Sequence, residues 1–297
     1  MFLKSVFYAM SVVVTAACSS GGATVDESFG PDPSPKPAVA VVKVTSFNIS
    51  VDSRDEHGWD KRREAVARMV NEERPTVMGI QEGQPHEITY LTKNCPDYAW
   101  YGLGRDTGKI PLATDSYAAE ECMAIFWRTA DVELLDKGTF WLSETPDKVS
   151  YGWDADYRRT ATWCRFRLKA TGTEFFYMNT HLDNKGQRAR EQSIRLIVEK
   201  LSELNKAGAT AFLTADFNSS TSSIIFDPLR SVLTDVRTHA PAADTGGTYN
   251  AWGAKSTVID HIFYKKATPT GFNVLRKNYG VIYISDHYPV EAIFRVQ

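Results

Sequence analysis

The chain has 297 residues, of which 43% are hydrophobic and 24% are charged, and its formal net charge is −2 at pH 7. This composition is typical of a soluble globular protein with a large core, and the length allows one large domain or two small ones. A charge so close to zero excludes an overall attraction to nucleic acid or anionic membranes, so any such affinity needs a local basic patch.

The first residues have the pattern of an export signal. Lys4 precedes an apolar segment at residues 6–17, which is too short to span a membrane and is typical of a signal-peptide core. The segment ends in Thr15-Ala16-Ala17-Cys18, which resembles a bacterial lipoprotein signal. We therefore expect a signal peptide over residues 1–18 with Cys18 as the lipidated residue. Because Thr15 departs from the usual aliphatic residue, ordinary secretion is the alternative, and both place the protein outside the cytoplasm.

Residues 19–37 are rich in Ser, Gly and Pro. Such a segment buries too little apolar surface to order itself and predicts a flexible linker. No second linker and no internal repeat follow, so we predict a single domain over residues 38–297. Membrane contact is then expected only through an N-terminal lipid anchor.

Strands and helices alternate from residue 38 onward. The first helix can be capped by Asp60 and stops before Pro75, and a later helix repeats Ile194, Ile197 and Leu201 at helical spacing. Two long polar or aromatic loops are expected at residues 104–120 and 143–159. This pattern predicts an α+β fold in which one sheet packs on another with helices outside. We predict strands at 41–49, 76–80, 98–103, 122–127, 132–135, 138–142, 160–168, 174–182, 209–215, 258–264 and 288–296, and helices at 60–73, 85–93 and 187–204.

Three cysteines remain if Cys18 is acylated: Cys95, Cys122 and Cys164. Their spacing is not that of a zinc site, and Cys122 and Cys164 lie in predicted strands. Buried thiols are the expected state, with one disulfide as the alternative in an oxidising compartment.

Polar motifs follow or begin several predicted strands. They are Ser46-Phe47-Asn48-Ile49, Gln81-Glu82, Asn179-Thr180-His181-Leu182-Asp183, Ala215-Asp216-Phe217-Asn218, Ile259-Asp260-His261-Ile262-Phe263 and Ser285-Asp286-His287. Each one alone is typical of an ordinary turn, but together and in this order they resemble the endonuclease/exonuclease/phosphatase (DNase I-like) superfamily. The resemblance covers about residues 41–296 and implies a four-layer α/β sandwich, with two packed mixed β-sheets and helices on the outer faces. The segments 141–146 and 152–154 further resemble secreted bacterial members of unassigned substrate.

The resemblance implies hydrolysis of a phosphoester with a divalent cation. Such a reaction needs a hard cation to neutralise phosphoryl charge, an oriented water and an acid for the leaving oxygen. Mg²⁺, or Mn²⁺ in its place, prefers oxygen ligands and keeps several waters, so few carboxylates suffice. We expect one or two ions, held by Glu82, Asn48 and Asp286.

The same resemblance assigns the acid and base groups. Asp216 is expected to orient or deprotonate the attacking water with Asn218, although an Asp-x-Asn sequence also forms plain Asx turns. His287 is expected to face the phosphate, with Asp260 accepting from its other ring nitrogen and raising its pKa. His181 is the predicted phosphate binder or general acid, and Glu121 is its predicted partner.

Arg159, Asp183 and Asn184 are the expected substrate-binding residues. The chain has Asn48-Ile49-Ser50-Val51 and lacks the patterns of abasic-site endonucleases. The expected substrate is a small phosphoester, a lipid headgroup or a phosphoglycan, and the protein is expected to be a monomer. The alternatives are an extracellular DNase I-like nuclease, for which little basic sequence is found, and a non-catalytic protein that binds phosphorylated ligands or glycans.

Overall fold

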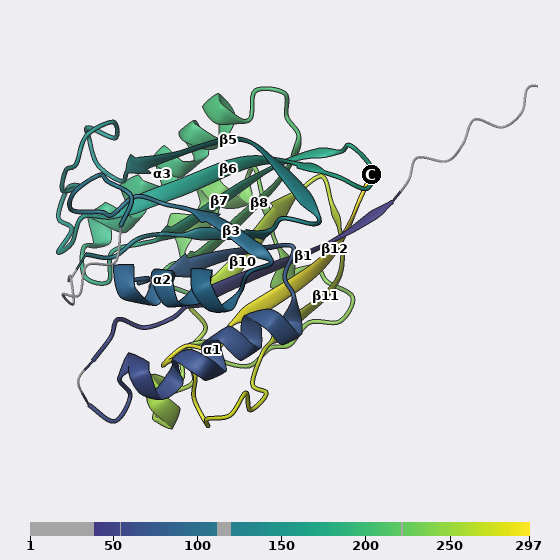
Figure 1. Ribbon diagram of the computed structural model, residues 1–297. Helices are drawn as coiled ribbons and strands as arrows, with labels where there is room; N and C mark the ends of the chain where they lie inside the picture. The colour runs from purple at the N-terminus through teal and green to yellow at the C-terminus, as the bar shows by residue number, and fades with distance from the viewer. Residues whose placement is uncertain (1–38, 54, 112–119, 221) are drawn as a thin grey trace, which may run out of the picture. The chain divides into compact units, whose positions relative to one another are not determined.

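Two six-stranded sheets, each mixing parallel and antiparallel pairs, form the domain. A computed structural model describes residues 39–53, 55–111, 120–220 and 222–297 (Figure 1). The predicted signal peptide, Cys18 and the whole predicted linker lie outside the described residues. The strand orders are β11-β12-β1-β2-β4-β3 and β5-β6-β7-β8-β10-β9. The elements are β1 (Ala40–Asn48), α1 (Trp59–Glu73), β2 (Val77–Gln81), α2 (Pro85–Asn94), β3 (Tyr98–Tyr101), β4 (Ile125–Arg128), β5 (Val132–Trp141), β6 (Thr160–Leu168), β7 (Glu174–His181), α3 (Gln187–Leu204), β8 (Thr210–Asp216), η1 (Ile224–Phe226), α4 (Asp227–Arg230), β9 (Thr234–Asp235), η2 (Val236–Thr238), η3 (Ala251–Gly253), β10 (Asp260–Lys265), β11 (Thr268–Val274) and β12 (Val290–Val296).

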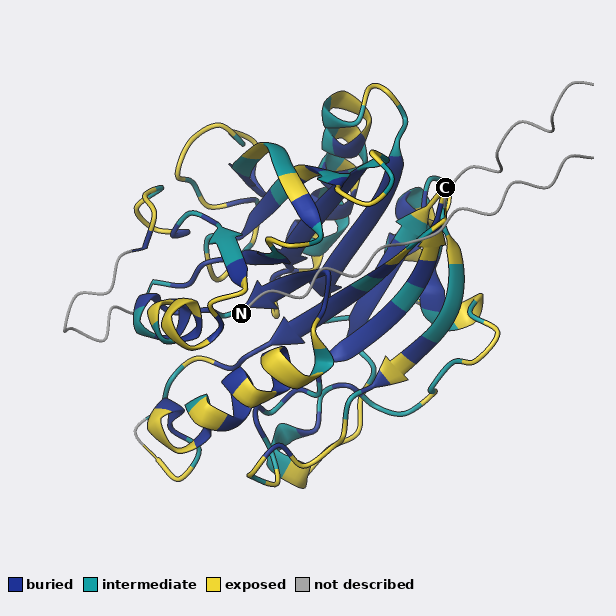
Figure 2. Ribbon diagram, turned by 45° about the vertical axis from the view of Figure 1, so that its right-hand side comes forward, coloured by how far each residue is buried: buried dark blue, intermediate teal, exposed yellow. Residues whose placement is uncertain are grey.

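Three apolar clusters define four layers. One cluster lies between the sheets and includes Tyr177, Phe212 and Phe294. A second joins α1 and α2 to the outer face of the first sheet, and a third joins α3 and α4 to the outer face of the second sheet. Figure 2 shows buried residues along the strands and exposed residues on the outer sides of the helices. The predicted α/β sandwich is therefore confirmed.

The register of the strands brings their polar terminal residues together at the same end of each sheet. In the first sheet, β1 and β2 run parallel and pair Asn48 with Gln81, while antiparallel β12 begins where β1 ends. In the second sheet, β7 and β8 run parallel and pair His181 with Asp216, and antiparallel β10 begins at Asp260, opposite Asp216. Thus four strand ends and two strand starts meet at the same edge.

Several parts of the sheets differ from the sequence prediction. β9, a two-residue strand, was not predicted. β11 was not predicted either, because Pro269 and Gly271 weaken its strand pattern; it is an edge strand with an irregular register between these two residues. The two short strands expected at 132–135 and 138–142 are instead one strand, β5, whose register shifts between Leu134 and Asp136.

Two further observations concern the state of the cysteines and the presence of membrane-spanning helices. Cys95, Cys122 and Cys164 are free and buried, as expected for apolar thiols, and form no disulfide. Burial raises the pKa of the Cys95 thiol to about 12. Within the described ranges, no helix combines the length and apolar character needed to cross a membrane.

Candidate active site

The side-chain amide of Asn48 connects the two sheets. Its nitrogen donates to Glu82 Oε1 at 2.9 Å and to Asp216 Oδ2 at 3.0 Å, and its oxygen accepts from the backbone N–H of Ser50 at 3.0 Å. Only the nitrogen can donate to carboxylates, so the contacts fix the amide orientation. The side chain thus bridges two carboxylates through its nitrogen, while its oxygen accepts one backbone N–H and keeps a second lone pair, so the metal-ligand role expected for Asn48 stays a prediction.

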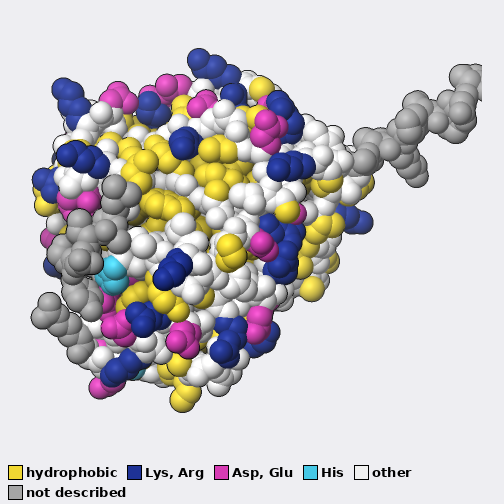
Figure 3. All heavy atoms as spheres, viewed as in Figure 1, with side chains coloured by type: hydrophobic (Ala, Val, Ile, Leu, Met, Phe, Trp, Pro, Cys, Tyr) yellow, Lys and Arg dark blue, Asp and Glu magenta, His cyan; other side chains and the backbone are white. Residues whose placement is uncertain are grey.

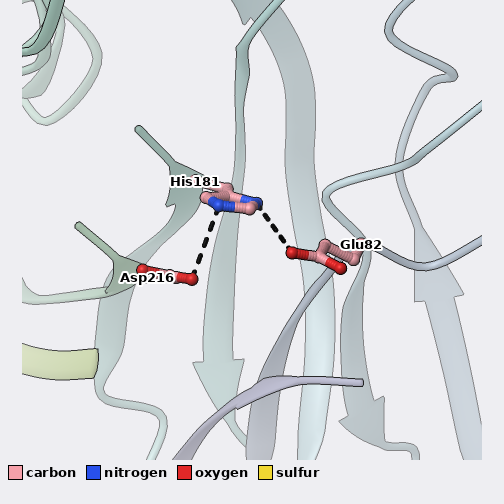
Figure 4. Close-up of side chains that lie close together, drawn as sticks. All are labelled: Glu82, His181 and Asp216. Carbon is pink, nitrogen blue, oxygen red and sulfur yellow. Dashed lines mark ion pairs between the residues drawn. The ribbon is translucent and has the colours of Figure 1, made fainter. Parts of the chain in front are cut away.

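His181, at the end of β7, lies between two acids. Its Nε2 is 3.4 Å from Asp216 Oδ2 and its Nδ1 is 4.0 Å from Glu82 Oε1 (Figure 4). Burial lowers the pKa of His181 well below its ordinary value, and the positive charges of Arg159 and His287 add to this effect. A neutral His181 can donate or accept hydrogen bonds but does not serve as an acid at neutral pH.

His287 has the opposite charge state. Its Nδ1 lies 2.8 Å from Asp260 Oδ2, and its Nε2 lies 3.7 Å from Asp216 Oδ2. Burial opposes the charged form, but the carboxylates of Asp260 and Asp216 outweigh burial and raise the pKa of His287 to about 10. The predicted Asp260–His287 contact is formed, and the ring is an imidazolium at neutral pH.

Asp216 and Asn218 form a turn at the end of β8. The N–H of Asn218 donates to Asp216 Oδ1 at 2.8 Å, which is an Asx turn, and Asn218 Nδ2 lies 2.8 Å from His181 Nε2 and 3.0 Å from the Leu182 oxygen. Burial, followed by the charge of Asp260, raises the pKa of Asp216 to about 7. The turn and the site are thus the same structure, because the turn directs both side chains towards His181.

Three strand ends place a residue other than glycine in the left-handed region. Ser50, Glu82 and Asn218 have φ values of 62°, 62° and 48°. Such residues cost about 1–3 kcal/mol each and concentrate at functional sites. At Glu82 this conformation accompanies contacts at both carboxylate oxygens, since Oε2 accepts from the N–H of Val51 at 2.9 Å.

A cavity of about 360 Å³ opens over these groups. Its lining includes the buried Arg159 and the exposed Asn184, both predicted substrate contacts. Tyr249, which was not predicted, packs beside His287 with ring centroids 4.9 Å apart. Predicted site residues that line the cavity are Glu82, Glu121, Arg159, His181, Asn184, Asp216, Asn218, Asp286 and His287.

Glu121 has a different partner from the one expected. Its Oε2 lies 2.6 Å from Arg105 Nη1, and His181 Nδ1 has no hydrogen-bond partner among the described residues. The predicted Glu121–His181 pair is therefore not formed, because the nearby guanidinium takes the carboxylate. Burial and the charge of Glu82 raise the pKa of Glu121 to about 7, against the effect of Arg105.

Asp183 is a structural residue. It is only 1% exposed, and its carboxylate accepts from the backbone N–H groups of residues 156, 157, 185 and 186 at 2.7–3.2 Å. It also lies 3.5 Å from Arg159 Nε. Its oxygens hold the aromatic loop and lie beside Arg159, and the substrate-binding role expected for Asp183 stays a prediction.

A buried amide network supports the site from between the sheets. Gln81 Nε2 donates to Asn179 Oδ1 at 2.6 Å, and Asn179 Nδ2 donates to the backbone oxygens of Ile80 and Ala124. Gly79 lies against Asn179 and Thr214 so closely that a β-carbon would fall 2.3–2.4 Å from them. The motifs contained Gln81 and Asn179, but sequence gave no sign that they pair across the sheets.

The geometry fits a divalent cation. Glu82, His181 and Asp216 each present a potential ligand atom within 4.8 Å of the others. Asp216, Asp260 and His287 lie equally close together, but the protonated His287 ring offers no lone pair to a metal. Burial raises the pKa of the Asp286 carboxyl, and the charge of Glu82 contributes to the rise. Because the carboxylates face one cavity, they form the oxygen-rich donor set that Mg²⁺ prefers.

Comparisons with known proteins agree with this architecture. A model of the endonuclease/exonuclease/phosphatase family matches residues 45–287. An endonuclease/exonuclease/phosphatase family protein from Bacteroides thetaiotaomicron is 32% identical, covers 88% of this chain and 99% of its own, and has a TM-score of 0.80. A mannosyl-6-phosphatase from the same species is 33% identical, covers 84% and 98%, and has a TM-score of 0.77.

More distant structures show the fold alone. The TDP2 of D. rerio, solved with a single-strand DNA product, is 18% identical, covers 86% of this chain and 99% of its own, and has a TM-score of 0.66. No match is found among curated proteins.

Proposed function

The chain belongs to the endonuclease/exonuclease/phosphatase family of phosphoester hydrolases, and we propose that it is a divalent-metal-dependent phosphomonoesterase that acts outside the cytoplasm on phosphorylated sugars or glycans. The observation that carries the proposal is the convergence of Glu82, His181, Asp216 and His287 on one cavity. A monoester of a sugar is favoured because a relative with 33% identity is a mannosyl-6-phosphatase.

The cation site is assigned to Glu82 and Asp286. When bound there, Mg²⁺ or Mn²⁺ supplies charge neutralisation for the phosphoryl oxygens. Both carboxylates line the cavity, and carboxylate oxygens are the ligands that Mg²⁺ prefers. Titration calorimetry with Mg²⁺ measures the number of ions bound per chain and so distinguishes a one-ion site from a two-ion site.

The protein groups divide the remaining chemistry between them. His287, held as an imidazolium by Asp260, donates to a phosphoryl oxygen as negative charge develops. Asp216, whose pKa is about 7, accepts a proton from the attacking water near neutral pH.

His181 and Arg159 bind the phosphate. Because Asn218 donates to His181 Nε2, the ring proton lies on Nδ1 and remains available as a donor. This favours the phosphate-binding role of His181 over the general-acid role. Arg159 adds a positive charge to the cavity lining.

A phosphoester panel tests the proposal. The full chain is incubated with mannose 6-phosphate, p-nitrophenyl phosphate, bis-p-nitrophenyl phosphate and single-stranded DNA, first with Mg²⁺ and then with EDTA. We expect Mg²⁺-dependent release of phosphate from the monoesters that EDTA abolishes. Preferential cleavage of DNA would establish the nuclease instead, and metal-independent binding without turnover would establish a binding protein.

The variant Glu82→Gln refines the test. We expect it to raise the Mg²⁺ concentration needed for half-maximal turnover, because one anionic ligand is lost. Glu203→Gln, at an exposed position near the far end of α3, is the matched control. An unchanged metal titration in Glu82→Gln would remove this residue from the ligand set.

The distribution of surface charge suits a substrate that is small, or whose remainder beyond the phosphate is uncharged. On the face drawn in Figure 3, basic and acidic side chains are interspersed rather than separated by sign. Of the three consecutive basic residues at 61–63, Arg62 is buried and Arg63 pairs with Asp60 at 2.5 Å. Lys61 and the partly exposed Arg63 make only a small basic patch for a nucleic-acid backbone.

The extracytoplasmic location is tested separately. Labelled palmitate is expected to be incorporated into the full chain expressed in bacteria and to be absent from Cys18→Ser. Incorporation that survives Cys18→Ser, or a protein found in the cytoplasm, would contradict this part of the proposal.

A further inference from the structure

A second cavity, of about 350 Å³, lies outside the catalytic groups. We name it the Trp252 groove; it is lined by His57, Lys61, Arg62, Trp252, Ile282 and Tyr283. The family motifs include none of these residues. The groove is open to solvent at Ile282, whose side chain is 78% exposed although it is large and apolar.

Three chain segments line both cavities. The segment after β1 supplies Val51 to the catalytic cavity and His57 to the groove. The segment around η3 supplies Tyr249 and Trp252 in the same way, and Figure 1 shows this turn below the N-terminal end of α1.

The third segment, before β12, supplies Asp286 to the catalytic cavity and Tyr283 to the groove. Residues three apart in sequence are separated by at most about 11 Å. The groove therefore begins within one sugar ring or two of the catalytic cavity.

The backbone holds Trp252 in an unusual conformation. Ala251 and Trp252 both have positive φ, at 46° and 55°, although neither is glycine. The backbone N–H groups of Asn250 and Ala251 donate to the backbone carbonyl oxygen of Asp286 at 2.7 and 3.0 Å. These bonds fix the turn to the segment that carries Asp286. Consecutive left-handed residues are costly and persist where the surroundings enforce them.

The indole of Trp252 stacks face to face on His57, with ring centroids 4.1 Å apart and planes that differ by 4°. His57 thus covers one face of the indole and fixes its orientation, and the rest of the ring lines the groove. Gly253 follows in a conformation with φ of 96°, and a β-carbon there would fall 2.5 Å from the Tyr283 hydroxyl, so glycine permits the approach of Tyr283. The indole is thus held in place before any ligand binds.

The Trp252 groove has both negatively and positively charged side chains. Glu56 and Lys61 lie at its edge and are exposed. Arg62 is not available to a ligand, because its guanidinium donates to the backbone oxygens of Ile49, Ser50, His57 and Ile284. Glu56 lies 3.8 Å from His57 Nε2, and Lys61 donates to the Asp55 backbone oxygen at 3.4 Å, but each keeps unused hydrogen-bonding capacity towards solvent. An exposed acceptor and an exposed donor beside an aromatic side chain suit a ligand with hydroxyl groups and an apolar face.

We propose that the Trp252 groove is a glycosyl subsite, which binds the sugar next to the phosphorylated one in a glycan substrate. The proposal rests on the proposed function for its connection to catalysis. A sugar stacks its C–H face on Trp252 and exchanges hydrogen bonds with Glu56 and Lys61. A nucleic-acid strand fits less well, because Glu56 repels a phosphodiester backbone.

Binding is measured first, in EDTA, so that no turnover is needed. Saturation-transfer NMR is recorded for α-mannobiose with the wild-type full chain, Trp252→Ala and Ile282→Ser. Ile224→Ser is the matched control, since Ile224 is 81% exposed and lines neither cavity. We expect a signal that persists in Ile224→Ser and is lost in Trp252→Ala and reduced in Ile282→Ser.

Catalysis is measured second, with Mg²⁺. The ratio of kcat/KM for a phosphorylated mannobiose to that for methyl phosphate is expected to fall about tenfold in Trp252→Ala, the size of a lost pocket contact. If Trp252→Ala fails to fold, Ile282→Ser provides the same comparison with a smaller expected fall.

The outcomes separate the two proposals. No phosphate release from any monoester contradicts the proposed function, while the NMR result still decides whether the groove binds sugar. An unchanged kinetic ratio, an NMR signal retained in Trp252→Ala, or no signal with the wild type overturns the glycosyl subsite. A Trp252-dependent signal from single-stranded DNA without one from mannobiose also overturns it.

Discussion

The side-chain amide of Asn48 donates a 3.0 Å hydrogen bond to Asp216, although the two residues lie 168 positions apart and belong to different sheets. The same nitrogen contacts Glu82 at 2.9 Å. One neutral donor therefore separates two carboxylates that repel each other, and it holds the ends of β1, β2 and β8 at a common point.

Replacing this donor by an acceptor tests the bridge. Asn48→Asp keeps the side-chain shape but adds a third carboxylate, so we expect turnover to fall about 10²-fold, as when one preorganised donor is removed. The free energy of unfolding should fall by about 1–3 kcal/mol, because Glu82 and Asp216 lose a buried partner. Asn71→Asp, on the exposed face of α1, is the control. Wild-type turnover and stability in Asn48→Asp would show that the bridge is dispensable.

Removal of the acid and base groups should stop the reaction. His287→Ala and Asp216→Ala are each expected to lower kcat by ~10²–10⁴, the usual contribution of a positioned acid or base. His239→Ala, at an exposed position, serves as the control in the same Mg²⁺-dependent assay. A change below tenfold in both active-site variants would mean that the reaction occurs elsewhere.

Asp183→Ala should lower stability and weaken substrate binding together. Its carboxylate accepts four backbone N–H groups and faces Arg159, so its loss leaves buried donors without a partner. We expect the free energy of unfolding to fall by about 1–3 kcal/mol and KM to rise. Asp136→Ala, on an exposed part of β5, is the matched control, and equal effects of the two substitutions would argue against the structural role.

The protein without metal should lose stability as the pH rises from 7 to 10. The pKa of folded His287 is raised from 6.5 to about 10, with burial opposing the rise and Asp260 and Asp216 outweighing it. The stability from protonated His287 is therefore complete below pH 6.5 and is lost as the pH passes about 10. The raised pKa of Asp216 makes its own contribution to stability fall at lower pH, as the pH rises from 3.8 to about 7, and so leaves the range from 7 to 10 to His287.

Urea unfolding in EDTA at pH 7 and pH 10 measures this loss. Other groups titrate in the same range, so the comparison is between wild type and Asp260→Asn. The loss should be smaller in the variant, because Asp260 is the larger of the two carboxylate contributions to the pKa of His287. An equal loss in both proteins would show that the pair does not couple to folding.

The sequence-based predictions were most accurate for site residues that lie at the ends of clearly apolar strands. The Asp260–His287 contact was predicted from the family resemblance, and the Asp216–Asn218 turn from an Asp-x-Asn sequence at a strand end; both are formed. The two-sheet fold follows from the same apolar strands. β11 was missed because its Pro and Gly suppress the strand pattern, while pairing with β12 supplies the stability.

Partner choice between distant segments could not be predicted. Glu121 pairs with Arg105 rather than His181, and the oxygen of Asn48 binds the Ser50 N–H. Asp183 follows His181 closely in sequence, yet the chain turns its carboxylate inward towards backbone N–H groups. These outcomes depend on distances of a few ångströms between loops, which residue types and spacing do not contain.

Anomalous scattering from crystals grown with Mn²⁺ tests the central claim most directly, namely that the separate strand ends share one cation-binding cavity. The account predicts a manganese peak within bonding distance of the Glu82 carboxylate, inside the cavity that contains Asp216 and His287. A peak bound only to residues outside this cavity, or no peak at a Mn²⁺ concentration that supports turnover, would contradict it.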